Sequence, residues 1–183
     1  MNCPELYIMN QLFFRLLLMS GIPFGLLMGI MSFHMGDNAD AILNGILSGL
    51  IFGTLVSYIL ISLHKSLSRK VDSGASMPDF DIHQVRHIVM GIPYEKAFSL
   101  CIRSLKTIDR CRIISQSLDN GEIRARAGLN WKTWGDDIII NLTEGKDTTG
   151  VEISSRPSAR STLVDFGKNL DNVERIRRFL IGQ

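Results

Sequence analysis

The alternation of apolar and polar positions divides the chain into two unequal parts. Residues 12–63 are crowded with apolar side chains, whereas most charged residues follow His64. Within this part, residues 16–33 and 41–63 carry no charge. As helices, these two runs would be roughly 27 Å and roughly 34 Å long, each close to the thickness of a bilayer core. The pattern predicts two transmembrane helices, at about 12–33 and 41–63, joined into an antiparallel hairpin by the polar turn 34–40.

Two other interpretations of these runs are weaker. A cleaved signal peptide would need a more basic start and a small-x-small cleavage site, neither of which is clear around the first run. A buried helix of a soluble protein would be shorter and less uniformly apolar than residues 41–63.

Basic residues give the hairpin a direction. Lys65, Arg69 and Lys70 follow the second helix, whereas the turn carries Asp37 and Asp40 but no Lys or Arg. The positive-inside rule then predicts a multi-pass protein of the inner membrane with both termini in the cytoplasm.

Each predicted membrane helix carries glycines four residues apart. The glycines are Gly21, Gly25 and Gly29 in the first helix and Gly45, Gly49 and Gly53 in the second. Residues four apart share one helix face, so each series forms a flat surface, of the kind called a glycine zipper, that lets another backbone approach closely. The two surfaces either face each other within one hairpin or pack between subunits.

The remainder of the chain predicts a small α+β domain. Residues 1–70 form the hairpin region, 71–82 a flexible linker, and 83–183 the soluble domain. Strands are predicted at 83–91, 111–118, 122–128, 137–143 and 149–155, with helices from 92 to about 107 and from 169 to 181. The order β-α-β-β-β-β-α is that of a helix-grip-like domain, a mainly antiparallel sheet covered by two helices.

A tight hairpin is predicted at Asp119-Asn120-Gly121. With a two-residue turn, Arg124 lies opposite Ser117 and Arg126 opposite Ser115, while Ile114 and Leu118 lie on the core face. The two arginines form a small basic strip. It is either a site for an anionic ligand or lipid headgroup, or a solvated outer face.

Trp131 and Trp134 stand in the connection between two predicted strands. They either plug the open end of the sheet, stack on a ligand, or lie at a membrane interface. Together with Arg124 and Arg126 they are the candidate ligand or partner surface.

The last helix is preceded by a segment rich in capping residues. Gly167 permits a turn, and Asn169 is predicted to N-cap the helix. A catalytic pair of Asp165 and Lys168 is a weaker alternative. No metal-ligand spacing, phosphate-binding loop or catalytic triad is recognisable, so no catalytic residue, metal or cofactor is expected.

Charge and cysteine content narrow the choice of partners. The net charge is −2 over residues 1–63 and +4 over residues 64–183, which permits contact with anionic lipid headgroups but does not indicate nucleic-acid binding. The three cysteines form no closed disulfide framework and fit a reducing cytosol, with Cys101 and Cys111 as small buried apolar residues.

Three segments carry a resemblance to a known family. They are Trp-Lys-x-Trp-Gly-Asp, Val-Glu-Ile-Ser-Ser-Arg-Pro and Asp-Phe-Gly-Lys-Asn-x-x-Asn-Val. Together, over about residues 86–181, they resemble a family of uncharacterised bacterial domains that are often attached to membrane helices, for which the resemblance implies no activity. At the level of fold, the domain is also similar to helix-grip domains of outer-membrane assembly lipoproteins, although the chain lacks a lipobox and Cys3 follows no apolar signal.

These observations favour a non-enzymatic interaction module at the inner membrane face, which associates with itself or with a membrane-protein partner. The alternative is a helix-grip domain that binds a lipid or another amphipathic molecule. That alternative predicts a continuous apolar cavity near Trp131 and Trp134.

Overall fold

The computed structural model describes residues 3–35, 40–71, 81–129 and 134–182. The chain divides into two compact units, residues 1–64 and residues 65–183, which are taken in turn below. Most of the predicted turn 34–40 and most of the predicted linker 71–82 lie outside the described residues.

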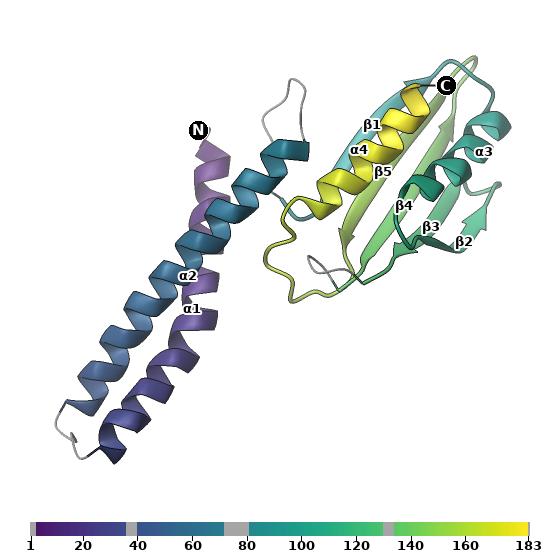
Figure 1. Cartoon of the computed structure of the whole chain (residues 1–183). Helices are drawn as coiled ribbons and strands as arrows, with labels where there is room; N and C mark the ends of the chain where they lie inside the picture. Colours follow the sequence, from purple (N-terminus) through teal and green to yellow (C-terminus); the bar gives the residue numbers. More distant parts are fainter. Residues whose placement is uncertain (1–2, 36–39, 72–80, 130–133, 183) are drawn as a thin grey trace. The chain divides into compact units, whose positions relative to one another are not determined.

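The N-terminal unit is built from two long helices (Figure 1). Helix α1 spans Cys3–His34, and α2 begins at Ala41 and runs to Val71. Within them, residues 9–34 and 41–69 are long and apolar enough to cross a membrane. Both helices extend beyond the predicted 12–33 and 41–63, because the flanking polar residues include good helix formers and no helix-breaking glycine.

The glycines of the two helices face each other within this one chain. A Cβ atom placed on Gly25 would lie 2.7 Å from the carbonyl oxygen of Gly45, and one on Gly49 would lie 2.7 Å from that of Gly21. Gly53 likewise abuts the carbonyl of Leu17 at 2.8 Å. Contacts this short leave no room for a side chain at these positions, so the two glycine series pack against each other within the hairpin.

Two further contacts join the helices, one among the glycines and one beyond Gly29 and Gly45. The rings of Phe24 and Phe52 are stacked with centroids 4.1 Å apart. The Asn44 amide donates a hydrogen bond of 3.0 Å to the Ser32 hydroxyl. In an apolar surrounding such a pair satisfies polar groups that would otherwise be costly.

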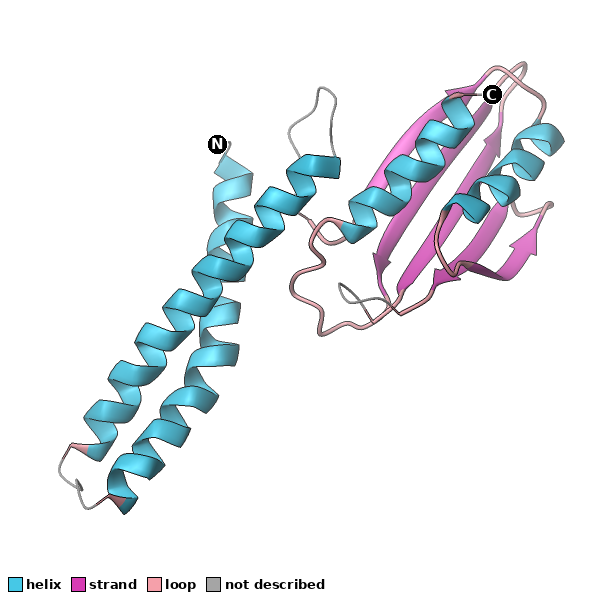
Figure 2. Cartoon of the chain, viewed as in Figure 1, coloured by secondary structure: helices cyan, strands magenta, loops and turns pink. Residues whose placement is uncertain are grey.

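The C-terminal unit is an α+β domain with the predicted order of elements (Figure 2). Its strands are β1 (Gln84–Met90), β2 (Arg112–Ser117), β3 (Glu122–Ala127), β4 (Asp136–Glu144) and β5 (Thr149–Pro157), and its helices are α3 (Tyr94–Ser104), which continues as the short 3-10 turn Leu105–Thr107, and α4 (Lys168–Ile181). The strand order is β1-β5-β4-β3-β2, and every neighbouring pair is antiparallel.

Both helices cover the same face of the sheet. Helix α4 packs on β5 and β1, and α3 packs on β4 and against α4. The apolar stripe of α4, Leu170, Val173, Ile176 and Leu180, is buried throughout. It meets the inward residues of the central strands, such as Ile138, Ile140 and Ile153, which alternate with outward residues as the strand period requires.

The predicted register of β2 with β3 is wrong by two residues. Ser117 pairs with Glu122 and Ser115 with Arg124, because the turn takes four residues rather than two and a bulge shifts the pairing between Ile113 and Ser115. Ile114 and Leu118, which were expected on the core face, are 56% and 41% exposed.

Candidate functional site

The two arginines of the predicted basic strip are held by carboxylates. On the face of the sheet that no helix covers, the guanidinium of Arg124 forms two hydrogen bonds of 2.8 Å with Glu122, and Arg126 Nε lies 2.8 Å from Asp137 Oδ1. The hydrogen bond from Arg124 lowers the pKa of the Glu122 carboxyl. Because each positive charge is neutralised locally, this face is a set of ion pairs rather than an open cationic surface.

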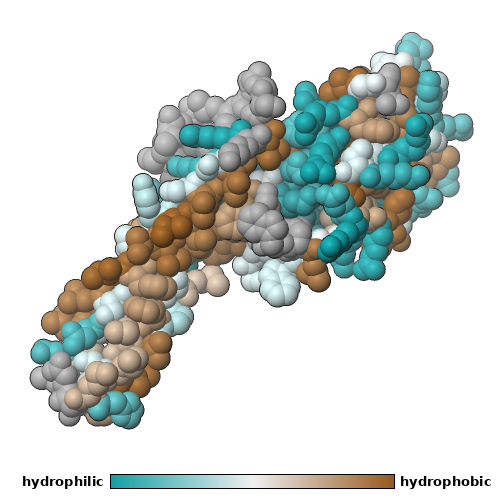
Figure 3. Space-filling view, viewed as in Figure 1, coloured by the Kyte–Doolittle hydropathy of each residue, from teal (hydrophilic) through white to brown (hydrophobic). Residues whose placement is uncertain are grey.

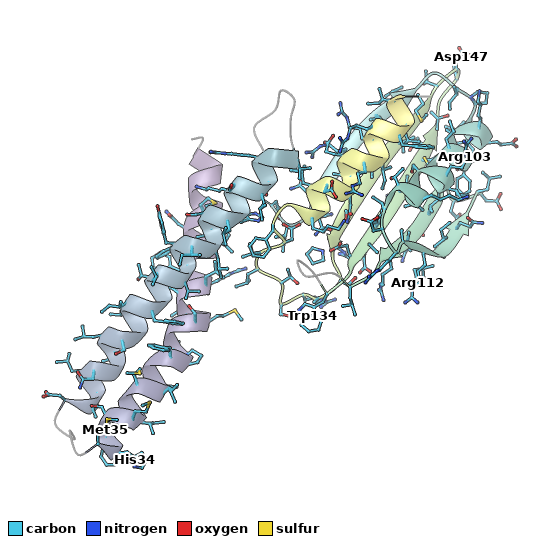
Figure 4. The ribbon with its side chains drawn as sticks, viewed as in Figure 1. His34, Met35, Arg103, Arg112, Trp134 and Asp147 are labelled. Atoms are coloured by element: carbon cyan, nitrogen blue, oxygen red, sulfur yellow. The ribbon has the colours of Figure 1, made fainter. Side chains whose placement is uncertain are left out.

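Trp134 does not plug the sheet. Its side chain is 78% exposed, in the connection that leads into β4. Figure 4 labels it toward the same end of the domain as Arg112, the first residue of β2. Trp131, the other tryptophan of the predicted surface, lies outside the described residues.

The edge strand β2 carries apolar side chains on the surface. Ile113 and Ile114 are exposed on it, and so are Leu118, which directly follows β2, and Leu129, which follows the neighbouring strand. Among the strands of the described residues, β3 alone pairs with β2, so the other edge of β2 has no described strand beside it. An unpaired edge with exposed apolar side chains is a template for an added strand.

The segment before α4 is built differently from the prediction. The helix begins at Lys168, after Gly167 in the left-handed conformation (φ 72°), so Asn169 lies inside the helix and is not its N-cap. Asp165 satisfies the first amides instead: its carboxylate accepts hydrogen bonds of 3.0 Å from Gly167 N and 2.9 Å from Asn169 N. Lys168 forms an ion pair at 3.6 Å with Asp171, so the catalytic Asp165–Lys168 alternative finds no support.

Asn169 belongs to a buried network of polar side chains. Its amide donates to Asp165 at 2.9 Å, and its carbonyl oxygen accepts a hydrogen bond of 2.7 Å from the Ser155 hydroxyl. Asn172, one helical turn further on, donates to that same hydroxyl and to Asp136, in each case at 3.2 Å. All five side chains are at most 1% exposed, so helix α4 is fixed to β4 and β5 by bonds that exclude water.

The three segments that carried the family resemblance meet in this network. Asp136 ends the first segment, Ser155 lies in the second, and Asp165, Asn169 and Asn172 belong to the third. The network is enclosed and offers no reacting group to solvent. These residues therefore position α4 and its preceding loop and form no open active site.

The space between α4 and the sheet is filled. The inward side chains of α4 are 0–3% exposed against strands whose inward residues are equally buried. A groove of about 450 Å³ is present elsewhere, where β1 ends beside α3 and the end of α4. It is lined by Ile88, Val89, Met90, Gly91, Ile92, Lys96, Leu100, Arg103, Leu180 and Ile181. In the described part of the domain, the predicted apolar cavity is therefore not found between α4 and the sheet. Besides the groove at the end of β1, the domain has a second hollow of about 650 Å³, lined by Pro93, Tyr94, Glu95, Leu118, Asp119, Asn120, Leu142, Thr143 and Glu144.

Other reactive groups in the described residues form no recognisable site. No cluster of three His, Cys, Asp or Glu side chains with metal-binding geometry occurs among residues 3–35, 40–71, 81–129 and 134–182. Burial raises the pKa of the Cys101 thiol to about 12. Burial also raises the pKa of Cys111, against a smaller lowering by Lys168. Neither thiol is therefore activated as a nucleophile.

Comparisons with known proteins add little to this. No family model matches the chain, and no curated protein matches it in sequence. Among solved structures, an uncharacterised protein from Bacillus thuringiensis is similar, with 14% identity and a TM-score of 0.39, over 55% of this chain and 93% of that one. A protein from Thermus thermophilus (8% identity, TM-score 0.35) and Ara h 8.0201 (10%, 0.28) also match 55% of this chain and cover 97% and 98% of their own lengths. Similarity this low says nothing about function.

Proposed function

We propose that this protein is a membrane-anchored, non-enzymatic interaction module. Its hairpin spans the inner membrane with both termini in the cytoplasm, and its α+β domain binds a protein partner at the inner face. The observation that carries the proposal is the outer surface of the hairpin, where large apolar side chains of both helices are exposed even though the helices are packed together; the face drawn in Figure 3 is mostly apolar along the hairpin. Among the exposed side chains are Leu26, Ile30, Ile42, Ile46 and Ile51. Hydrocarbon is the solvent that suits such a surface.

The exposed edge of β2 is the proposed partner surface. A partner that adds a strand there would gain main-chain hydrogen bonds from the free edge and would cover the apolar side chains of Ile113 and Ile114. The exposed Trp134 extends the apolar surface at the end of the sheet. The partner is either a second copy of the chain or another membrane protein.

If the chain associates with a second copy, the packing of the hairpin favours the edge of β2 over the glycines as the surface of contact. Gly25 and Gly49 are in contact with the opposite helix of the same chain. The glycines otherwise only line an apolar groove between the two helices, whereas the edge of β2 presents main-chain groups as well as apolar side chains.

The finer assignment of the domain is part of the same proposal. A C-terminal helix laid on a five-stranded antiparallel sheet supports a helix-grip-like fold. The convergence of the three motif segments on one buried network supports membership of the family of uncharacterised, membrane-attached bacterial domains, because a shared network would explain why those residues occur together.

A photo-crosslinking amino acid at position 114 tests the partner surface. In membranes from cells that express the full chain, we expect one discrete adduct, whose mass distinguishes a second copy from another protein. Thr143 is also exposed, on β4, which β3 separates from β2, and it serves as the control position. No adduct from position 114, or the same adduct from position 143, would exclude β2 as the partner surface.

A further inference from the structure

The groove at the end of β1 combines an apolar floor with a cationic wall. Met90, Leu100 and Leu180 line it and are themselves at most 9% exposed, so they form a fixed floor rather than mobile side chains. Val89 and Ile181 line it at the surface, where they are 74% and 61% exposed. A volume of about 450 Å³ is within the range of small-molecule sites.

Helix α3 supplies both positive charges. Lys96, Leu100 and Arg103 follow each other at spacings of four and three residues, so they share one face of α3, and all three line the groove. Lys96 and Arg103 are exposed, and within the described part of the chain no ion pair holds either of them. This distinguishes them from Arg124 and Arg126, which are paired with carboxylates.

We propose that this groove binds a small single-chain amphiphile with a carboxylate head. Its apolar chain lies along Met90 and Leu180, and its carboxylate lies between Lys96 and Arg103. Apolar burial supplies affinity in such a site, while a planar guanidinium that donates to both oxygens of a carboxylate supplies the preference for an anion. The proposal does not involve β2, so it stands or falls independently of the partner surface.

Photolabelling of the full chain in nanodiscs of neutral phosphatidylcholine tests the proposal. The probe is octanoate that carries a diazirine, compared with the corresponding octanol and octylamine probes at equal concentration. We expect octanoate to label peptides that contain residues 88–92, 100 and 180–181 roughly tenfold more than either comparison probe, a ratio typical of one charge-assisted contact.

A double substitution tests the cationic wall. Lys96→Gln with Arg103→Gln should reduce octanoate labelling of the groove roughly tenfold and bring it to the level of octanol. The matched control, Arg112→Gln with Arg160→Gln, removes the same two charges from exposed positions outside the groove and should leave labelling unchanged. Equal labelling by octanoate and octanol in the parent protein, or no effect of the first pair, would overturn the proposal.

Gly91 allows the groove to be blocked without disturbing the core. A Cβ atom at this position would meet no other atom within 4 Å, so Gly91→Trp fills open space. We expect this variant to keep the parent's melting temperature and to lose groove labelling by all three probes. Full labelling in a folded Gly91→Trp protein would show that the probes bind elsewhere.

Discussion

At the residue scale, the buried amide of Asn169 decides how firmly α4 is held. The side chain gives one hydrogen bond to Asp165 and accepts one from Ser155, and all three side chains are at most 1% exposed. Asn169→Asp replaces the donor with a second carboxylate 2.9 Å from the first. We expect it to lower the free energy of unfolding by about 2–4 kcal/mol at pH 7, since an unpaired buried charge is costly.

The same substitution at Asn141 is the control for this prediction. Asn141 also donates to a carboxylate, that of Glu152 at 3.1 Å, but it lies on the exposed face of the sheet. Asn141→Asp should cost less than about 1 kcal/mol because water solvates both charges. Urea unfolding in detergent micelles measures both variants. Equal losses at the two positions would contradict a role for burial.

The Cys101 thiol gives a second prediction at this scale. Its pKa is raised from an ordinary value of 9.0 to about 12 by burial. Between these two pH values the unfolded chain loses a proton that the folded chain keeps, so stability falls as pH rises, by up to about 1.4 kcal/mol per pH unit. Cys101→Ala lacks this ionisation. The difference in unfolding free energy between parent and variant should therefore depend on pH only above about pH 9. A constant difference from pH 8 to 11 would show that the thiol is accessible to water.

At the scale of elements, the sequence predicts a helix or strand most reliably where the same apolar period continues over many residues. The apolar runs of α1 and α2 and the stripe of α4 specify one element each, because many positions agree. The β2–β3 register depends on one turn and one bulge, and local sequence did not show that the turn takes four residues. The N-cap was misplaced for a similar reason: Asp165 reaches over Gly167, which requires a left-handed backbone that only the structure reveals.

At the candidate site too, local patterns were predicted correctly less often where contacts join residues that are distant in the sequence. The exposure of Trp134 and the pairing of Arg126 with Asp137 depend on neighbours in space, which periodicity does not specify. The buried network was signalled by the density of Asp and Asn around the start of α4. Local capping rules assigned these residues to the helix start, whereas their partners Ser155 and Asp136 come from distant strands.

The glycine contact between α1 and α2 yields a prediction about the hairpin. Gly25→Leu places a side chain where the Gly45 carbonyl already lies 2.7 Å from the Cβ position, so the helices must separate. Phe24→Cys with Phe52→Cys, in a chain whose native cysteines are alanine, reports this separation through disulfide formation, because the two rings are stacked. We expect oxidation to be rapid in the parent and at least about tenfold slower with Gly25→Leu, since disulfides tolerate little change in Cα separation.

Thr54→Leu is the control for the hairpin. Thr54 is exposed on α2, so a larger side chain there should leave the disulfide rate unchanged. A rate that falls equally in both variants would indicate a general effect of leucine. A rate unaffected by Gly25→Leu would show that the glycines do not hold the helices together.

At the scale of the whole molecule, the proposed topology depends on which side of the membrane receives the basic residues. Asp40 precedes α2, and Lys65 and Arg69 lie near its other end. In chains without native cysteines, Asp40→Cys should react with a membrane-impermeant maleimide in intact cells, whereas Lys146→Cys, in an exposed turn of the α+β domain, should react only after permeabilisation. The reverse pattern would place the domain outside the cell, and with it the partner surface and the groove. Labelling of both positions in intact cells would show that the hairpin does not span the membrane.

Because the positive-inside rule depends on charge, adding lysines beside Asp40 should weaken the protection of position 146 from the maleimide. This response would separate an orientation that is directed by charge from a fixed one.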